Sequence, residues 1–297
     1  MNPYLLPATD AFGKPRRYVL NVSGGRTSGF LLRQVLDAND GRLPPHVVPV
    51  FANTGKEREE TLVFLNRMDR EWNVGLRWLE YRHRPWAAGG AKDPKHVHGV
   101  VDFATAARKG EPFEAMIRAK KMLPHVVARM CTDQLKVSTI QRYVVRSLGW
   151  PRKGWTSVLG IRADEPRRIR AALMENCTVT YPLALAGVTL EDVDRYWRQA
   201  PFDLGIRSDQ GNCDLCFLKG KGKLLALIAE EPELADWWIK QEEYRDAHGR
   251  DLRKAEIAWF RKRESYRELR RLALSQSRLA FADGPDDAGA SCFCGDG

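Results

Sequence analysis

The segment Tyr18-Val-Leu-Asn-Val-Ser-Gly-Gly-Arg-Thr-Ser-Gly29 passes from an apolar run into a loop of small and hydroxyl residues. Tyr18 to Val22 predicts a buried strand, and the apolar spacing from Leu31 to Leu36 predicts a helix. The loop between them would lie at a helix N-terminus, where backbone N–H groups and the helix dipole attract anions. A simple glycine turn with a serine cap is the alternative. The candidate phosphate-binding residues are Ser23, Gly24, Gly25, Arg26, Thr27 and Ser28.

A second polar segment follows a second apolar run. His46 to Phe51 predicts a strand, and Glu57 to Thr61 predicts the start of a helix. In open α/β sheets, ligands bind at the carboxyl ends of the strands, so both polar segments would face one crevice. The nucleotide-binding candidates here are Asn53, Thr54, Gly55 and Glu57. This pattern fits two alternative roles for Glu57, a magnesium ligand or a helix cap.

Strand-like and helical patterns alternate through Tyr81, which favours a doubly wound, mostly parallel α/β sheet. An irregular loop over the active site is expected from Arg82 to His98, and a helical stretch from Val101 to Met122 that is interrupted by Gly110 and Pro112. Further strands are expected at Trp155–Gly160 and Cys177–Pro182. Other expected helices are Lys136–Leu148 and a Thr189-capped helix to Arg198.

Five motifs in order along the chain resemble the phosphoadenosine phosphosulfate (PAPS) reductase-like family of the adenine nucleotide alpha-hydrolase (PP-loop ATP pyrophosphatase) superfamily. They are Ser23-Gly-Gly-Arg-Thr-Ser28, Asn53-Thr-Gly-Lys-Glu57, Met130-Cys-Thr-Asp-Gln-Leu-Lys136, Gly160-Ile-Arg-Ala-Asp-Glu-Pro-Arg-Arg168 and Asn212-Cys-Asp-Leu-Cys-Phe217. The resemblance spans roughly Tyr18 to Trp238. It implies a PP-loop nucleotide-binding α/β domain at residues 1–205 and a mainly helical, cysteine-bearing region at 206–297.

The resemblance also implies a reaction. ATP or a related adenine nucleotide would be bound and cleaved at its alpha phosphate, with adenylation supporting iron–sulfur-dependent sulfur transfer onto DNA or tRNA. Arg26, Lys136, Arg162 and Arg168 are the catalytic candidates, because guanidinium and ammonium groups neutralise phosphate oxygens. A cysteine desulfurase or thioredoxin is the expected sulfur-donor or reductant partner. Arg26-Thr27 stands where many relatives carry Lys-Asp, which weakens the case for Mg²⁺ at the triphosphate.

Six cysteines in a chain without a signal peptide indicate a metal site or catalysis more than disulfides. From the residues alone, the Cys213–Cys216 pair fits a redox couple, part of a zinc site or part of an iron–sulfur site. The resemblance favours a [4Fe–4S] cluster on Cys131, Cys213, Cys216 and either Cys292 or Cys294. Whether either tail cysteine is a ligand or a nucleophile stays open. Cys177 reads as a small buried apolar residue.

Two other functions compete with sulfur transfer. A sulfonucleotide reductase would attack PAPS, or its unphosphorylated analogue, with a tail cysteine. Those reductases end in Glu-Cys-Gly-Leu-His or a close variant, whereas this chain ends in Cys292-Phe-Cys-Gly-Asp-Gly297 and has one cysteine near position 131. The third function is that of a non-catalytic accessory protein that binds nucleotide or nucleic acid.

The whole chain of 297 residues carries a formal net charge of +10, which favours polyanionic partners. Basic residues at Arg261–Arg263 and Arg267–Arg271 alternate with Trp259, Phe260 and Tyr266, which would stack on nucleic-acid bases or pack inward. Trp237 and Trp238 are expected in the core. No apolar run is long enough to cross a bilayer, and the start lacks a signal peptide, so the cytoplasm is expected and no membrane partner.

Overall fold

The structure is a computed structural model that describes residues 2–83, 96–169, 178–244, 259–261 and 264–275. Its centre is a six-stranded sheet in the order β4-β3-β2-β1-β5-β6. The strands are β1 (Tyr18–Asn21), β2 (Val47–Asn53), β3 (Arg77–His83), β4 (His96–Val101), β5 (Thr156–Val158) and β6 (Thr178–Thr180). All neighbouring pairs are parallel except β3 with β4. The expected doubly wound, mostly parallel α/β fold is confirmed.

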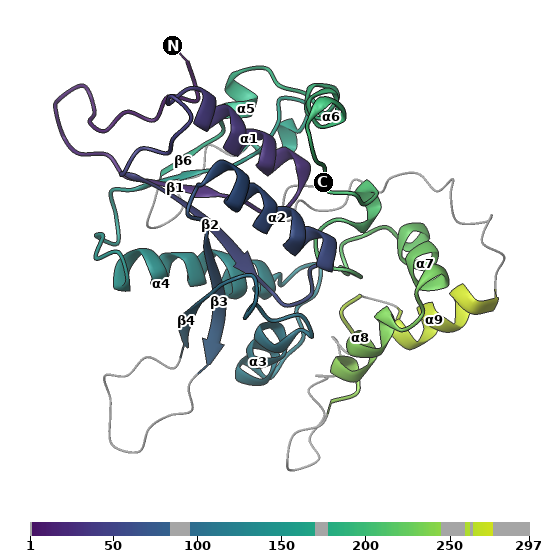
Figure 1. Ribbon diagram of the computed structural model, residues 1–297. Helices are drawn as coiled ribbons and strands as arrows, with labels where there is room; N and C mark the ends of the chain where they lie inside the picture. The colour runs from purple at the N-terminus through teal and green to yellow at the C-terminus, as the bar shows by residue number, and fades with distance from the viewer. Residues whose placement is uncertain (1, 84–95, 170–177, 245–258, 262–263, 276–297) are drawn as a thin grey trace, which may run out of the picture.

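Helices cover both faces of this sheet (Figure 1). Those of the α/β part are α1 (Arg26–Asp37), α2 (Glu59–Trp72), α3 (Glu111–Lys120), α4 (Ser138–Arg146), α5 (Pro182–Leu185) and α6 (Leu190–Gln199). Strand residues alternate between two cores, as the period of a strand requires. Leu20 packs in the core beneath α1, α2 and α6, whereas the adjacent Val19 packs beneath α4.

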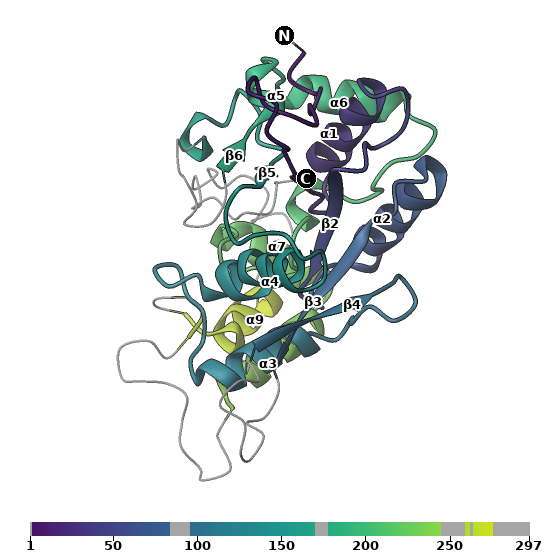
Figure 2. The same cartoon turned by 90° about the vertical axis from the view of Figure 1, so that its left-hand side faces the viewer.

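Short helices and three later helices complete the chain. The short ones are the π-helix η1 (Thr132–Val137) and the 3₁₀ helices η2 (Pro166–Arg168) and η3 (Ser208–Gln210). The later ones are α7 (Lys221–Glu230), α8 (Leu234–Glu242) and α9 (Tyr266–Ser275), which lie together beside the sheet domain (Figures 1 and 2). Their core includes Trp238, which is fully buried as expected, and also Phe113 and Met116 of α3. The division at residue 205 stays a prediction.

The segment around residues 96–110 differs from expectation. His96 to Val101 forms β4, antiparallel to β3, so residues 82–83 and 96–98 are strand where an irregular loop was expected. The expected helix from Val101 to Met122 is wrong in its first half, since α3 begins only at Glu111. Gly110 adopts φ +83° as its N-cap, a conformation that ends any preceding helix. The part of the expected loop at 84–95 lies outside the described residues.

The aromatic residues that lie among the basic C-terminal residues were expected either to stack on bases or to pack inward. Phe260 and Tyr266 are fully buried, so neither presents a ring for base stacking, and the inward-packing alternative is correct for these two. Among the basic residues, Arg267 pairs with Glu243 and Arg270 with Asp236. Within the part of the chain that is described, no helix is long and apolar enough to cross a membrane.

Candidate functional site

The loop from Ser23 to Gly25 connects β1 directly to the N-terminus of α1. Gly24 has φ +90°, and a Cβ there would lie 2.5 Å from the Thr61 side chain, so glycine is required twice over. The Ser28 hydroxyl accepts hydrogen bonds from the Ser23 backbone N–H (3.0 Å) and hydroxyl (3.1 Å). The loop is therefore a compact turn whose first helical N–H groups have no acceptor within the helix itself.

A pocket opens beside this loop at the carboxyl ends of β1, β2 and β5. β1 lies between β2 and β5, so this is the point where the strand order reverses and α/β proteins bind ligands. Its cavity volume is about 40 Å³, room for a few water molecules or one anionic group. The lining residues are Asn21, Val22, Ser23, Ser28, Val50, Phe51, Ala52, Lys136, Ile140, Leu159, Gly160 and Ile161.

The Gly160–Arg168 motif lies against this loop. A Cβ on Gly160 would stand 3.4 Å from Ser28 Cα, so the two segments are in close contact. Arg162 is buried, and its Nη1 donates to Thr27 Oγ1 at 3.0 Å. The Arg162 Nε donates to Asp164 Oδ1 at 2.9 Å. This salt bridge is the contact expected if Arg162 has a purely structural role.

Two predicted phosphate ligands are engaged with carboxylates. Arg26 forms a two-bond fork with Asp203, at 2.7 Å and 2.5 Å, and also donates to the Ile206 carbonyl. Arg168 pairs with Glu165 in η2. Of the four catalytic candidates, the structure places Lys136 in the lining of the pocket, whereas the other three guanidinium groups bind protein partners.

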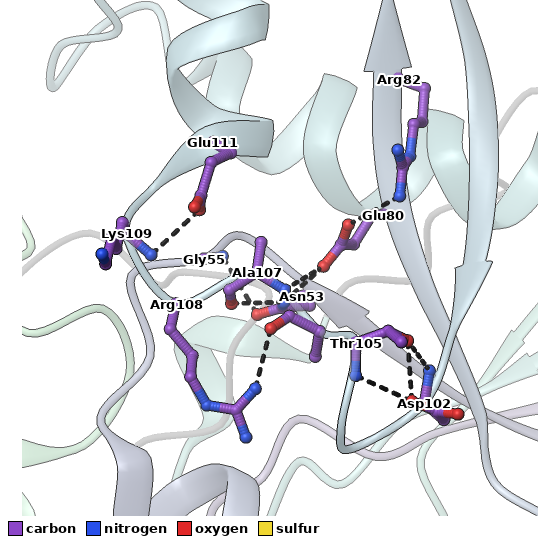
Figure 3. A network of polar contacts seen from close by, with 11 residues as sticks. Asn53, Gly55, Glu80, Arg82, Asp102, Thr105, Ala107, Arg108, Lys109 and Glu111 are labelled. Atoms are coloured by element: carbon purple, nitrogen blue, oxygen red, sulfur yellow. Dashed lines mark hydrogen bonds and ion pairs between the residues drawn. The ribbon is translucent and has the colours of Figure 1, made fainter.

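The Asn53–Glu57 segment is buried beside the pocket, and none of its residues lines it. Figure 3 shows Asn53 donating from Nδ2 to Glu80 Oε1 (2.8 Å) and to the Ala107 carbonyl (2.9 Å). The Gly55 carbonyl accepts a hydrogen bond from the Gly110 N–H at 2.8 Å. The Thr54 hydroxyl donates to the Glu57 carboxylate, so this hydrogen bond lies within the segment itself. These four predicted nucleotide ligands thus brace the carboxyl end of β2, and direct contact with nucleotide stays a prediction.

The Cys213–Cys216 loop is bound to this same segment. Glu57 and Cys213 form an isolated antiparallel bridge, and the Thr54 hydroxyl lies 3.5 Å from Cys213 Sγ. Lys56 Nζ lies 2.6 Å from Asp214 Oδ2, with both side chains more than nine-tenths buried. The other oxygen, Asp214 Oδ1, accepts from Trp238 Nε1 at 2.9 Å. The second and fifth motifs therefore form one structural unit.

Charged groups surround the two thiols. Burial, and secondarily the Glu57 carboxylate, raise the pKa of the Cys213 thiol, whereas Lys136 opposes that shift. Burial lowers the pKa of Lys219, which donates to the carbonyls of Asp209 (2.7 Å) and Gly211 (2.5 Å). Lys136 thus lines the pocket and also favours the ionised form of Cys213. The third motif therefore lies between the first and the fifth.

The described residues do not fit a metal cluster on their own. Cys131 and Cys216 are half-buried and Cys213 is buried, all in or against the core of α7 to α9. Over the described ranges, no three cysteine, histidine or acidic side chains are arranged to hold a metal ion. Cys177, Cys292 and Cys294 lie outside those ranges. The iron–sulfur cluster and Mg²⁺ stay predictions from the resemblance.

Sequence reasoning missed two functional-looking residues inside the motifs it quoted. Lys56 and Asp214 occupy variable positions of their motifs, and nothing in the spacing pairs them. Their only signal was opposite charge in two of the five quoted motifs, and opposite charge alone does not show which residues pair. Glu80, which holds Asn53, had no motif at all.

The sheet order, the loop and the pocket define an α/β protein of the doubly wound class with a polar site at the carboxyl edge of its strands. No family model matches the sequence. The uncharacterized nin region protein ORF290 of Escherichia phage lambda is 33% identical over 214 residues, covering 72% of this chain and 70% of ORF290. The chain belongs to the family of ORF290.

A solved structure is similar at greater distance. It is a crystal structure of PAPS reductase from Candida auris in a phosphate complex. The similarity covers 68% of this chain and 82% of that chain, at 13% identity and a TM-score of 0.37.

Proposed function

We propose that this protein is a PP-loop enzyme that binds ATP or a related adenine nucleotide with its phosphates at the Ser23–Ser28 loop. The observation that carries the proposal is the pocket at the strand-order reversal, lined by both loop serines and by Lys136. Helix N–H groups, hydroxyls and an ammonium group are the donors that phosphate oxygens require. The small cavity suits the anionic end of the nucleotide, with the nucleoside lying over the adjoining surface.

The proposed chemistry is attack at the alpha phosphate with release of pyrophosphate. The charge that develops on the leaving group would be stabilised by the loop amides and by Lys136, whose positive charge is already placed. A sulfur nucleophile from a donor protein would then displace AMP from the adenylated substrate, proposed to be a nucleic acid, so that the bond to the adenylated oxygen breaks as the bond to sulfur forms. Burial raises the pKa of the Cys213 thiol, which disfavours its ionisation to an attacking thiolate.

Nucleotide binding by calorimetry tests the proposal. Lys136→Gln should weaken ATP affinity about tenfold to a hundredfold, the value of one charge-assisted hydrogen bond. Lys240→Gln is the matched control, because this lysine lies on α8 with a side chain 66% exposed and should leave affinity unchanged. If wild-type protein binds neither ATP nor PAPS, the proposal is wrong.

Two product assays then separate the candidate reactions. Pyrophosphate release from ATP supports adenylation, whereas sulfite release from PAPS with thioredoxin supports a sulfonucleotide reductase. Nucleotide binding without either product identifies a non-catalytic accessory protein. Iron and zinc content of anaerobically purified protein tests the cluster prediction independently of these assays.

A further inference from the structure

A second cleft lies along α4, at the other end of the helix from Lys136. It is lined by Gln141, Arg142, Val145, Arg146, Arg152 and Trp155, with a volume of about 320 Å³. Trp155 immediately precedes β5, so this cleft lies toward the amino ends of the parallel strands. The nucleotide pocket lies at their carboxyl ends. Figure 1 shows α4 lengthwise beside the sheet.

The three arginines of this cleft differ from many other arginines in the described part of the chain. Arg26, Arg58 and Arg162 are examples of guanidinium groups that pair with carboxylates. In the described structure, no ion pair joins a carboxylate to Arg142, Arg146 or Arg152. No acidic residue is among the described residues that line the cleft.

Two of the residues that line the cleft carry a buried donor atom with no acceptor among the described residues. Trp155 is 4% exposed, and its Nε1 has no hydrogen-bond partner. Arg142 Nη1 is also buried without a partner, while its Nη2 reaches only Gln134 Oε1, at 3.5 Å. A buried donor left unsatisfied costs about 1–3 kcal/mol, so such groups normally have a partner. Both atoms are covered by protein, so a ligand with several acceptor oxygens would satisfy them once these two side chains turn toward it.

Positive charge is concentrated around these donors. Burial lowers the pKa of Arg142, and Arg146 adds to that shift, while Tyr81 and Asp133 oppose it. Burial likewise lowers the pKa of His98 on the neighbouring strand, with Arg146 and Arg142 adding to it. The like charges repel one another, and a bound anion would relieve that repulsion.

We propose that the α4 cleft is a phosphate-binding site, separate from the nucleotide pocket. Guanidinium groups match phosphate oxygens in pairs, and the indole N–H adds a fixed neutral donor. The phosphate could belong to a nucleic-acid backbone or to a small phosphorylated molecule, which present the same oxygens. The proposal does not depend on the proposed nucleotide chemistry.

Thermal unfolding with inorganic phosphate tests the site, using chloride at matched ionic strength as the reference. Phosphate should raise the Tm of wild-type protein, and Arg146→Gln/Arg152→Gln should lose at least half of that rise. Both side chains are exposed, so the double variant should fold. Arg67→Gln/Arg195→Gln is the matched control, because it removes the same charge from α2 and α6 and should keep the full rise. An equal rise in both double variants overturns the proposal.

Two further arms separate the source of the phosphate and the role of the other pocket. If the cleft holds a nucleic-acid strand, Arg146→Gln/Arg152→Gln should bind a labelled oligothymidylate more weakly than wild type in fluorescence anisotropy. The slope of log affinity against log salt concentration should then be smaller in the variant by about 0.7 per lost contact. Unchanged oligonucleotide binding, with the phosphate response lost, assigns the cleft to a small phosphorylated molecule. Lys136→Gln should keep the cleft's phosphate response while its ATP affinity is weakened, so the two proposals can fail separately.

Discussion

The ion pair between Lys56 and Asp214 is a single contact that joins two distant motifs. Both side chains are more than nine-tenths buried, and Lys56 also lies over the Trp237 ring at 5.0 Å. Asp214→Asn keeps an acceptor for Trp238 but leaves the Lys56 ammonium buried without its counter-charge. We expect unfolding free energy to fall by about 3 kcal/mol, as for other broken buried pairs, in urea titrations.

A double variant provides the control for this residue. Lys56→Met/Asp214→Asn removes the unpaired ammonium and keeps an apolar stem against Trp237, so it should recover part of the stability lost in Asp214→Asn. A double variant that is less stable than the single variant would contradict the argument. The sequence showed both motifs but not this pair, because a long-range contact leaves no local pattern.

Gly29 shows how α1 is held at the element scale. It lies within α1, and a Cβ there would stand 2.8 Å from both Met68 Sδ and Trp197 Cζ2. Gly29→Ala gains up to about 1 kcal/mol of helix propensity but overpacks the contact with α2 and α6, at about 1–3 kcal/mol. We expect a net loss of stability by thermal unfolding. A variant more stable than wild type would mean that the helices separate easily.

Glu242 gives α8 and α9 a pH-dependent contact. Its carboxylate accepts from the N–H groups of Phe260 (3.3 Å) and Tyr266 (2.8 Å), and burial raises its pKa from 4.5 to about 8. Between these values the folded chain retains a proton that the unfolded chain has released. Its contribution to the unfolding free energy therefore falls as pH rises through this window, by roughly 1.4 kcal/mol per unit.

Glu242→Gln should remove that slope, since the amide does not titrate. Urea unfolding at several pH values between about 5 and 8 measures it. Every other titratable group is the same in both proteins, so the difference between the two slopes isolates Glu242. Equal slopes would show that this carboxylate is ionised throughout.

Helices and strands with a strong periodic pattern could be predicted from the sequence. Strands that form only because they pair with a neighbouring strand could not. The Thr189 cap is an example of success, because its capping box with Asp192 is local chemistry that the sequence displays. β4 is an example of failure. Its histidines and glycine have no alternating apolar pattern, and it becomes a strand only by pairing with β3.

At the scale of the whole molecule, the sequence predicted that the first two motifs follow two strands and face one crevice at the carboxyl edge of the sheet. The structure brings the loop, the Gly160 motif and Lys136 to the pocket, and attaches the cysteine loop to the end of β2. Direct ligands could not be distinguished from supporting residues by sequence. Asn53 and Glu57 have the same polar character as Ser23, and only burial against protein partners separates them.

The core beneath α7, α8 and α9 makes a prediction about cooperativity. Phe113 and Met116 of α3 pack in that core with Trp238, so unfolding of the C-terminal helices would expose apolar surface of the α/β part. We therefore expect the full chain to unfold in one transition, although the sequence suggested two regions. Far-UV circular dichroism follows all helices, while labelling of the buried Cys213 thiol follows the C-terminal core. Coincident midpoints in urea support the shared core, and Cys213 labelling at lower urea would show that the C-terminal helices open as a separate unit.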